Sequence, residues 1–131
     1  MKSLFRLKVS LQTKLFDTAN AFDNTTNYRF QPTVAGYYQI NFGVRAYVAS
    51  GSITGFYAIL YKNSARYRVG GQAFSGSFGN YPIYTGSDLV YMNGSTDYLE
   101  LWGNITGTSP IFNYNDNTSS SYFSGYLARS A

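Results

Sequence analysis

The side chains that could do chemistry are few in this sequence. The chain has 131 residues and contains no His and no Cys, so the commonest general bases, thiol nucleophiles and metal ligands are missing. Its six carboxylates are Asp17, Asp23, Asp88, Asp97, Glu100 and Asp116. Only Asp97 and Glu100 lie close together, and a separation of three residues on a strand directs them to opposite faces. They cannot act as a catalytic pair, and we expect no enzyme activity.

The segment around Asp116 has the composition of a loop that could hold a calcium ion through oxygen atoms (residues 113–118, NYNDNT). It contains one carboxylate and lacks the spacing of an EF-hand, so turn formation is the better interpretation. The sequence also lacks a Gly-rich phosphate-binding loop followed by Lys and then Ser or Thr. We therefore expect no cofactor and no bound metal.

The composition favours strands and turns over helices. Aromatic residues make up 19% of the chain, with 14 Tyr and 10 Phe, and charged residues make up only 12%. Tyr, Phe and Thr are enriched in strands, whereas Gly, Asn and Ser are typical of turns. No run of about 18 apolar residues occurs, so we expect no membrane insertion. One all-β domain is the expected architecture for a chain of this length.

The ten basic residues give a formal net charge of +4 and are scattered along the chain. They come closest together near its start, where Arg6 and Lys8 alternate with Leu7 and Val9. One interpretation is the solvent face of an edge strand, on which Lys and Arg discourage unwanted pairing. The other is a strip that binds an anion or docks a partner. No nucleic-acid-binding motif accompanies these residues, so nucleic acid is not an expected partner. The same charges interrupt the apolar run that a signal peptide requires.

The clearest structural pattern lies in residues 34–48. Even positions from 38 onward are apolar, whereas odd positions are mostly polar or small. This period of two predicts a strand with one face on the core. Tyr37 and Tyr47 then fall on the opposite face, either as ordinary surface residues or as contacts with another subunit. In Gly55–Lys62 both alternate sets are apolar or aromatic, so we expect that strand to be covered on both sides.

Other strand-like runs alternate with turn-forming clusters, as in a β-sandwich. We expect strands at residues 4–16, 28–30, 65–69, 88–93, 97–105 and 121–127, a surface loop at 17–27, and irregular strands with a flexible loop across 70–86. Residues 1–15 form either the first strand or an arm that docks on a neighbour. Residues 16–131 form the main domain.

Four segments combine into a recognisable pattern. In Tyr28–Ile40 (YRFQPTVAGYYQI), an aromatic, a turn and Gly-x-Tyr-x-Ile lead into a long strand. Leu60–Asn63 (LYKN) has the form of an apolar-x-Lys-Asn turn, and Leu89–Trp102 (LVYMNGSTDYLELW) that of paired strands joined around Thr-Asp. Tyr122–Leu127 (YFSGYL) is a closing strand of the form F-x-G-F-L. Together these segments resemble the C1q-like domains of the C1q and tumour-necrosis-factor superfamily, which have Phe, Gly and Phe where this chain has Ile40, Thr96 and Tyr126.

The resemblance extends over residues 16–127 and implies an antiparallel jelly-roll sandwich of about ten strands that assembles as a homotrimer. The segment DNTTNYRFQPT at residues 23–33, the many Tyr residues and the absence of Cys are most similar to the C1q-like domains of bacteriophage virion proteins. This placement implies a non-catalytic structural protein of the virion, assembled in the host cytoplasm as a fibre tip, spike or decoration module. Its partners would be other virion proteins and a glycan or protein of the host surface.

Aromatic residues supply the candidate contact sites. Residues opposite the expected core positions are candidates for the trimer interface: Tyr37, Tyr57, Tyr61 and Tyr126. Residues in turn-rich segments are candidates for surface binding loops: Tyr81, Tyr84, Phe112 and Tyr114. Two alternatives to the virion protein stay open, a secreted C1q/TNF-like ligand or adhesin and a carbohydrate-binding module.

Overall fold

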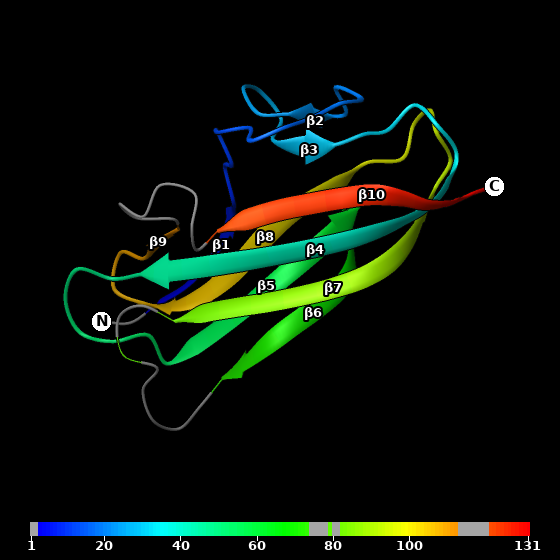
Figure 1. Cartoon of the computed structure of the whole chain (residues 1–131). Coiled ribbons are helices and arrows are strands. Elements are labelled where there is room, and N and C mark those ends of the chain that lie inside the picture. The colour runs from blue at the N-terminus through cyan, green and yellow to red at the C-terminus, as the bar shows by residue number, and fades with distance from the viewer. Residues whose placement is uncertain (1–2, 74–78, 80–81, 113–120) are drawn as a thin grey trace.

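The computed structural model describes residues 3–73, 79, 82–112 and 121–131, and within them the chain forms ten strands and no helix (Figure 1). The strands are β1 (Ser3–Lys8), β2 (Phe22–Asp23), β3 (Arg29–Phe30), β4 (Gly36–Tyr47), β5 (Gly55–Lys62), β6 (Ala65–Ala73), β7 (Ile83–Met92), β8 (Leu99–Gly107), β9 (Ile111–Phe112) and β10 (Tyr122–Ser130). The expected all-β class is confirmed. The described part of the chain contains no helix that could cross a membrane.

The strands form two antiparallel sheets that pack face to face (Figure 1). The larger, which we call the β8 sheet, has the order β2-β3-β8-β5-β6, and β1 also pairs with β8. The smaller, which we call the β4 sheet, has the order β10-β4-β7, and β9 also pairs with β4. Along one edge of β8, β3 pairs with Leu99 and Glu100, and β1 pairs with Trp102–Gly107. The pairings thus define a two-layer β-sandwich.

The core lies between the two sheets and follows the period-two pattern of β4. The buried side chains of this strand and its continuation are Tyr38, Ile40, Phe42, Val44, Ala46 and Val48. They pack against residues of the β8 sheet, which include Phe56, Ala58, Leu60, Leu99, Leu101 and Ile105. The sequence prediction for this face is confirmed, because alternate residues of a strand point to opposite sides of the sheet.

Strand β5 is also buried on its outer side, as its pattern of apolar residues predicts. Ile59 is completely buried although it points away from the core between the sheets. Its cross-strand neighbours are Trp102 of β8 and Val69 of β6. Next to it, Tyr61 stacks on Trp102 with a ring-centroid distance of 5.4 Å. Side chains of the sheet itself therefore cover this strand.

The strand boundaries differ from the sequence prediction at several places. The first strand ends at Lys8 rather than at residue 16. Val9 donates one further hydrogen bond to Leu101 O (2.8 Å), and the residues that follow are mostly polar. The expected loop at 17–27 contains the short strand β2, which pairs with β3. In the region expected to be irregular, β6 continues to Ala73 and β7 begins at Ile83, since both have long pairing partners.

Two tight turns depend on unusual backbone angles. Asn63 and Ser64 join β5 to β6 with φ of 52° and 68°, as a two-residue hairpin with two positive φ angles requires. Asn63 also donates to Asp97 Oδ1 (2.8 Å) and accepts from Tyr98 N (3.0 Å), which holds two turns together. Gly94, with φ of 76°, packs against the backbone before β4.

Strands β6 and β7 end their respective sheets among the described residues. Arg68 of β6 lies across from Leu60, and Asp88 of β7 lies across from Ile40, so both point to the inner side of their sheets. Their side chains form an ion pair through Arg68 Nε and Asp88 Oδ2. This pair links the two sheets at one side of the sandwich.

Candidate functional site

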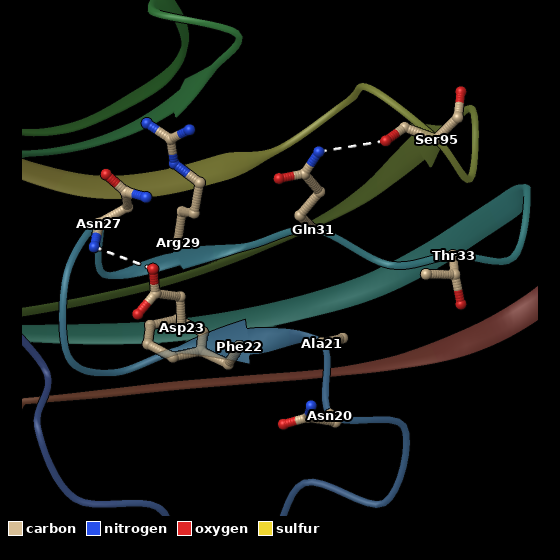
Figure 2. Close-up of a pocket in the computed structure, with 9 residues that line it drawn as sticks. All are labelled: Asn20, Ala21, Phe22, Asp23, Asn27, Arg29, Gln31, Thr33 and Ser95. Atoms are coloured by element: carbon tan, nitrogen blue, oxygen red, sulfur yellow. Dashed lines mark hydrogen bonds between the residues drawn. The ribbon is translucent and has the colours of Figure 1, made fainter.

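A polar hollow lies beside strands β2 and β3 (Figure 2). Its walls come from both strands and from the turns around them, and its lining residues are Asn20, Ala21, Phe22, Asp23, Asn27, Arg29, Gln31, Thr33 and Ser95. Gln31 Nε2 donates to Ser95 O (3.1 Å) and so connects the hollow to the turn before β8. Amide and hydroxyl groups dominate the lining, with a carboxylate and a guanidinium.

The carboxylate in this hollow is occupied by its own loop. Asp23 accepts backbone hydrogen bonds from Thr25, Thr26 and Asn27, each at 3.0 Å, and Figure 2 shows the bond from Asn27. The N–H groups of Thr26, Thr25 and Asn27 hold the pKa of Asp23 far below its usual range. A carboxylate of such low pKa is a poor general base. In this hollow the carboxylate of Asp23 therefore organises its own loop through hydrogen bonds.

Asp17 has a similar structural role. It accepts from the N–H groups of Ala21 (2.9 Å) and Phe22 (3.0 Å) and forms an ion pair with Lys14 (2.9 Å). Partial burial acts to raise the pKa of Asp17, but the Lys14 contact and the two backbone bonds outweigh it and lower the pKa. The two acidic residues before β3 thus stabilise loops.

Glu100 is the centre of a charged cluster on the outer face of the β8 sheet. Its Oε2 lies 2.9 Å from Lys8 Nζ and 2.9 Å from Arg29 Nη2, and its Oε1 accepts from Trp102 Nε1 at 3.1 Å. Burial alone would raise the pKa of Glu100, but hydrogen bonds from Lys8, Trp102 and Arg29 outweigh it and lower the pKa. This carboxylate is fully engaged and joins β1, β3 and β8.

Asp97 and Glu100 bind different partners, but not for the reason expected: β8 begins at Leu99 rather than at residue 97, so Asp97 lies in the turn before the strand. Asp97 binds Asn63 and Asn93 at the turns, and it lies 3.5 Å from Lys62 Nζ. The bond from Asn63 is the largest cause of its lowered pKa. Within the described residues, no group of three carboxylates could hold a metal ion. Asp116, the residue weighed for calcium, lies outside the described residues.

The outer face of the β4 sheet is different in character. Four large side chains point to solvent from three neighbouring strands and are between 40% and 62% exposed: Tyr37, Leu89, Tyr91 and Tyr126. Tyr37 and Tyr91 lie directly across from each other, with ring centroids 5.4 Å apart. Leu89 and Tyr126 flank Gln39 from opposite sides. The four residues thus expose large side chains on one face of three neighbouring strands, with the polar Gln39 between Leu89 and Tyr126.

The four interface candidates divide between the two sheets. Tyr37 and Tyr126 share the outer face of the β4 sheet, 40% and 62% exposed. Tyr57 and Tyr61 lie on the outer face of the β8 sheet, where Tyr57 is half-buried. Tyr61 is only 7% exposed because it stacks on Trp102, so it presents little surface to a second subunit.

The four loop candidates are placed differently from the prediction where the structure describes them. Tyr84 lies inside β7 and its ring packs over Gly70. Phe112 lies in β9 and its ring packs over Gly103. Both are partly buried against the core, because the facing strand carries a glycine that leaves room for an aromatic ring. These two residues therefore lie in strands rather than in the expected loops. Tyr81 and Tyr114 lie outside the described residues.

The sequence analysis missed Leu89 and Tyr91 as members of the exposed surface. The odd positions of β7 point outward from Ile83 to Tyr91, and all are exposed. Leu89 and Tyr91 both lie within the expected strand 88–93, but Leu89–Met92 is apolar throughout, so a period of two could not tell which side chains point outward.

Comparison with known proteins gives little further information. No protein-family model and no curated protein matches the chain. Among solved structures, it is similar to dimeric latent PorU from Porphyromonas gingivalis, with a TM-score of 0.45 and 16% sequence identity. The match covers 95% of this chain and 12% of that one, so the chain spans about an eighth of the length of the structure it matches. Function is therefore inferred from the chain's own residues.

Proposed function

We propose that this protein is a non-catalytic structural protein of a bacteriophage virion that self-assembles through the outer face of its β4 sheet. The observation that carries the proposal is the surface formed by Tyr37, Leu89, Tyr91 and Tyr126. Exposed apolar surfaces that are continuous mark interaction sites, whereas scattered apolar residues do not. Here four large exposed side chains gather on the same face of three neighbouring strands, although Gln39 lies between Leu89 and Tyr126.

The charge distribution supports a second copy of this chain as the partner. The protein carries a net charge of +4, so two copies repel each other on average. The centre of the β4 sheet's outer face carries uncharged residues, which include Gln39, Asn41, Ser87 and Ser124. Arg45 lies toward one end of this face, and Arg129 lies directly across from Tyr37 at the other. The uncharged centre of the face is complementary to its own copy, as a symmetric interface requires.

The aromatic side chains suit such a contact. Tyr buries a large area with little loss of conformational freedom, and its hydroxyl can stay at the wet rim of an interface. Each 100 Å² of apolar surface removed from water contributes about 2.5 kcal/mol. The rings of Tyr37 and Tyr91 already contact each other, so part of the cost of ordering them is met before association.

The finer parts of the proposal rest on the sequence resemblance. These are the C1q-like jelly roll, the homotrimer, and the position in a virion as a fibre tip, spike or decoration module. The role is attachment to other virion proteins, to the host surface, or to both.

The solution mass tests the assembly. We expect sedimentation equilibrium at micromolar concentration to give a mass near three times 14.6 kDa. Replacement of Tyr37 by Arg should convert the assembly to monomer, because it places an unpaired charge in the contact. Val69→Arg is the matched control, since Val69 is 49% exposed on the other sheet. Val69→Arg should keep the assembled mass.

Three results would overturn parts of the proposal. A wild-type protein that is monomeric at micromolar concentration would rule out self-assembly. An assembled mass that survives both Tyr37→Arg and Leu89→Arg, with unchanged thermal unfolding, would place the interface elsewhere. Mass spectrometry of purified phage particles tests the virion assignment, and particles that lack the protein would refute it.

A further inference from the structure

Strand β10 leaves one edge of the β4 sheet unpaired. Within the described residues, it pairs with β4 along one side and with no strand along the other. All residues of β10 except Phe123 are exposed. A bulge shifts the register between Leu127 and Arg129, so the regular part of this edge is Tyr122–Leu127. Its outer backbone N–H and C=O groups are therefore available to another extended strand.

The other long edges among the described strands are protected against such addition. Strand β1 carries Arg6 and Lys8, and the inward-pointing ion pair of Arg68 and Asp88 closes the side where β6 and β7 lie. Charges of both kinds are common protections of edge strands. By contrast, residues 122–128 (YFSGYLA) contain no charge and no proline. Of the long described edges, that of β10 alone lacks a charged protection along its regular part.

The outer residues of this segment are symmetric in sequence about Ser124. Tyr122, Ser124 and Tyr126 point to the outer face of the sheet, away from the core. Two antiparallel copies of β10 that meet at Ser124 would place Tyr122 of each copy against Tyr126 of the other, and aromatic pairs across strands are stabilising. On the inner side Phe123 would lie opposite Gly125, which has no side chain to oppose the ring. The segment is therefore complementary to itself.

The charges favour the same antiparallel arrangement. Arg129 is the one charged residue of residues 122–130. In two copies related about Ser124, the two Arg129 positions lie at opposite ends, about 30 Å apart along the strands. Parallel pairing would instead set the two arginines side by side. The net charge of +4 still opposes association, so the contact should strengthen as salt screens this repulsion.

We propose that β10 pairs with β10 of a second copy of this chain, antiparallel and centred on Ser124, so that two β4 sheets become one. Backbone hydrogen bonds supply the affinity, and the tyrosines set the register. The contact is small because one strand edge meets another, and we expect a dissociation constant of about 0.1–1 mM. This contact is distinct from the assembly through the outer face, although Tyr126 lies at both.

A single cysteine tests the contact, because the chain contains no Cys. Ser124→Cys sets two thiols directly across from each other in the paired dimer, at a separation that a disulfide can bridge. Ser87→Cys is the matched control: Ser87 is also exposed and also lies across from Asn41, but on β7. Both are combined with Leu89→Arg, which is designed to disrupt the outer-face assembly and leaves β10 unchanged.

Oxidation of the two cysteine variants should give different results. We expect Ser124→Cys to form disulfide dimers of twice 14.6 kDa. They should form at least about tenfold faster than those of Ser87→Cys, because pairing holds the thiols together. In protein without cysteine, the NMR signals of the β10 amides should shift as the concentration is raised to about 1 mM, while those of β7 stay constant.

Charge exchange at Ser124 tests the register. Ser124→Lys and Ser124→Glu should each weaken self-association at least about threefold, because like charges then lie directly opposite each other. An equimolar mixture of the two variants should associate more tightly than either alone, since Lys then faces Glu. The same changes at Ser87 alter the net charge equally and should show no such rescue. Thermal unfolding checks that each variant is folded.

The proposal is overturned if the β10 amide signals stay unchanged up to about 1 mM. Equal cross-linking of Ser124→Cys and Ser87→Cys would show random collision and would also overturn it. A mixture of the Lys and Glu variants that associates no better than either alone would refute the pairing about Ser124. An unrelated strand-forming peptide that binds β10 as tightly as a second copy would refute the choice of partner. A monomeric wild type at micromolar concentration would affect only the outer-face assembly.

Discussion

The cluster around Glu100 allows a quantitative test of how the β8 sheet is held together. The perturbation is Glu100→Gln, which removes the negative charge and keeps the size of the side chain. The Glu100 side chain is 5% exposed, whereas those of Lys8 and Arg29 are each 26% exposed. Lys8 and Arg29 would lose their common counter-ion while they stay packed between β1, β3 and β8.

The size of the effect follows from this burial. Loss of one partner in a fully buried ion pair costs about 3–5 kcal/mol, and an exposed pair contributes about 0–1 kcal/mol. Because water still reaches both cations, we place the loss for Glu100→Gln at about 2–3 kcal/mol of unfolding free energy. With an unfolding entropy of about 2.1 cal/mol/K per residue, this corresponds to a fall in Tm of about 7–11 °C.

The pH dependence of the stability provides a second, independent test of the Glu100 cluster. The pKa of Glu100 is lowered from its ordinary value of 4.5 in the folded protein. The ionised form is therefore favoured by folding, and its contribution is complete above the unfolded-state pKa. That contribution is lost as the pH falls through the folded-state pKa. The difference in Tm between wild type and Glu100→Gln should be constant near neutral pH and should shrink as the pH falls below 4.5.

Thermal unfolding followed by circular dichroism measures these quantities, and a double-mutant cycle assigns the cause. Lys8→Met should cost less in the Glu100→Gln background than in the wild type, because its partner is already absent. Asp88→Asn serves as the control: its partner Arg68 is 61% exposed, so we expect a loss of at most about 1 kcal/mol. A Glu100→Gln protein with an unchanged Tm, or with a Tm difference that stays constant down to low pH, would refute this reasoning.

Two further predictions concern the tight turns. Gly94→Ala should lower the unfolding free energy by about 2–4 kcal/mol, because φ is positive and a Cβ would lie 2.8 Å from Val34 C and 3.0 Å from Ala35 Cα. Urea denaturation at neutral pH measures this loss of stability. A loss below about 0.5 kcal/mol would contradict the geometry. Ser64→Gly should instead stabilise the protein by about 0.5–1 kcal/mol, since Gly relieves the positive φ and the lost hydroxyl contact with Tyr98 is exposed. An unchanged or lower denaturation midpoint would show that the contact outweighs the backbone strain.

Local patterns in the sequence predicted the parts of the fold that depend on one strand. The alternation around Ile40 identified the core face of β4, because burial on one side leaves a period of two. It also identified Tyr37 as exposed, since its side chain follows directly from its position on the strand. The double-sided burial of β5 was readable for the same reason, from the apolar character of Ile59 and its neighbours.

Features that depend on the pairing of distant strands could not be predicted. Tyr61 is buried because Trp102 of β8 stacks on it, and nothing within β5 specifies that partner. Glu100 meets cations from β1 and β3, whose register against β8 is set by the whole sheet. Tyr84 fills space left by Gly70 on another strand, so its turn-rich surroundings misled the assignment to a loop. Register between strands is a property of global packing rather than of local propensity.

The ion pair between Arg68 and Asp88 has a consequence for the protein at high concentration. It closes the side of the sandwich where β6 and β7 leave backbone groups unpaired among the described residues. Another strand could add there only by burying or breaking a charged pair, and inward-pointing charges at sheet edges are a known obstacle to such addition. At this side of the sandwich, the two sheets are therefore kept from being continued by a strand of a neighbouring molecule.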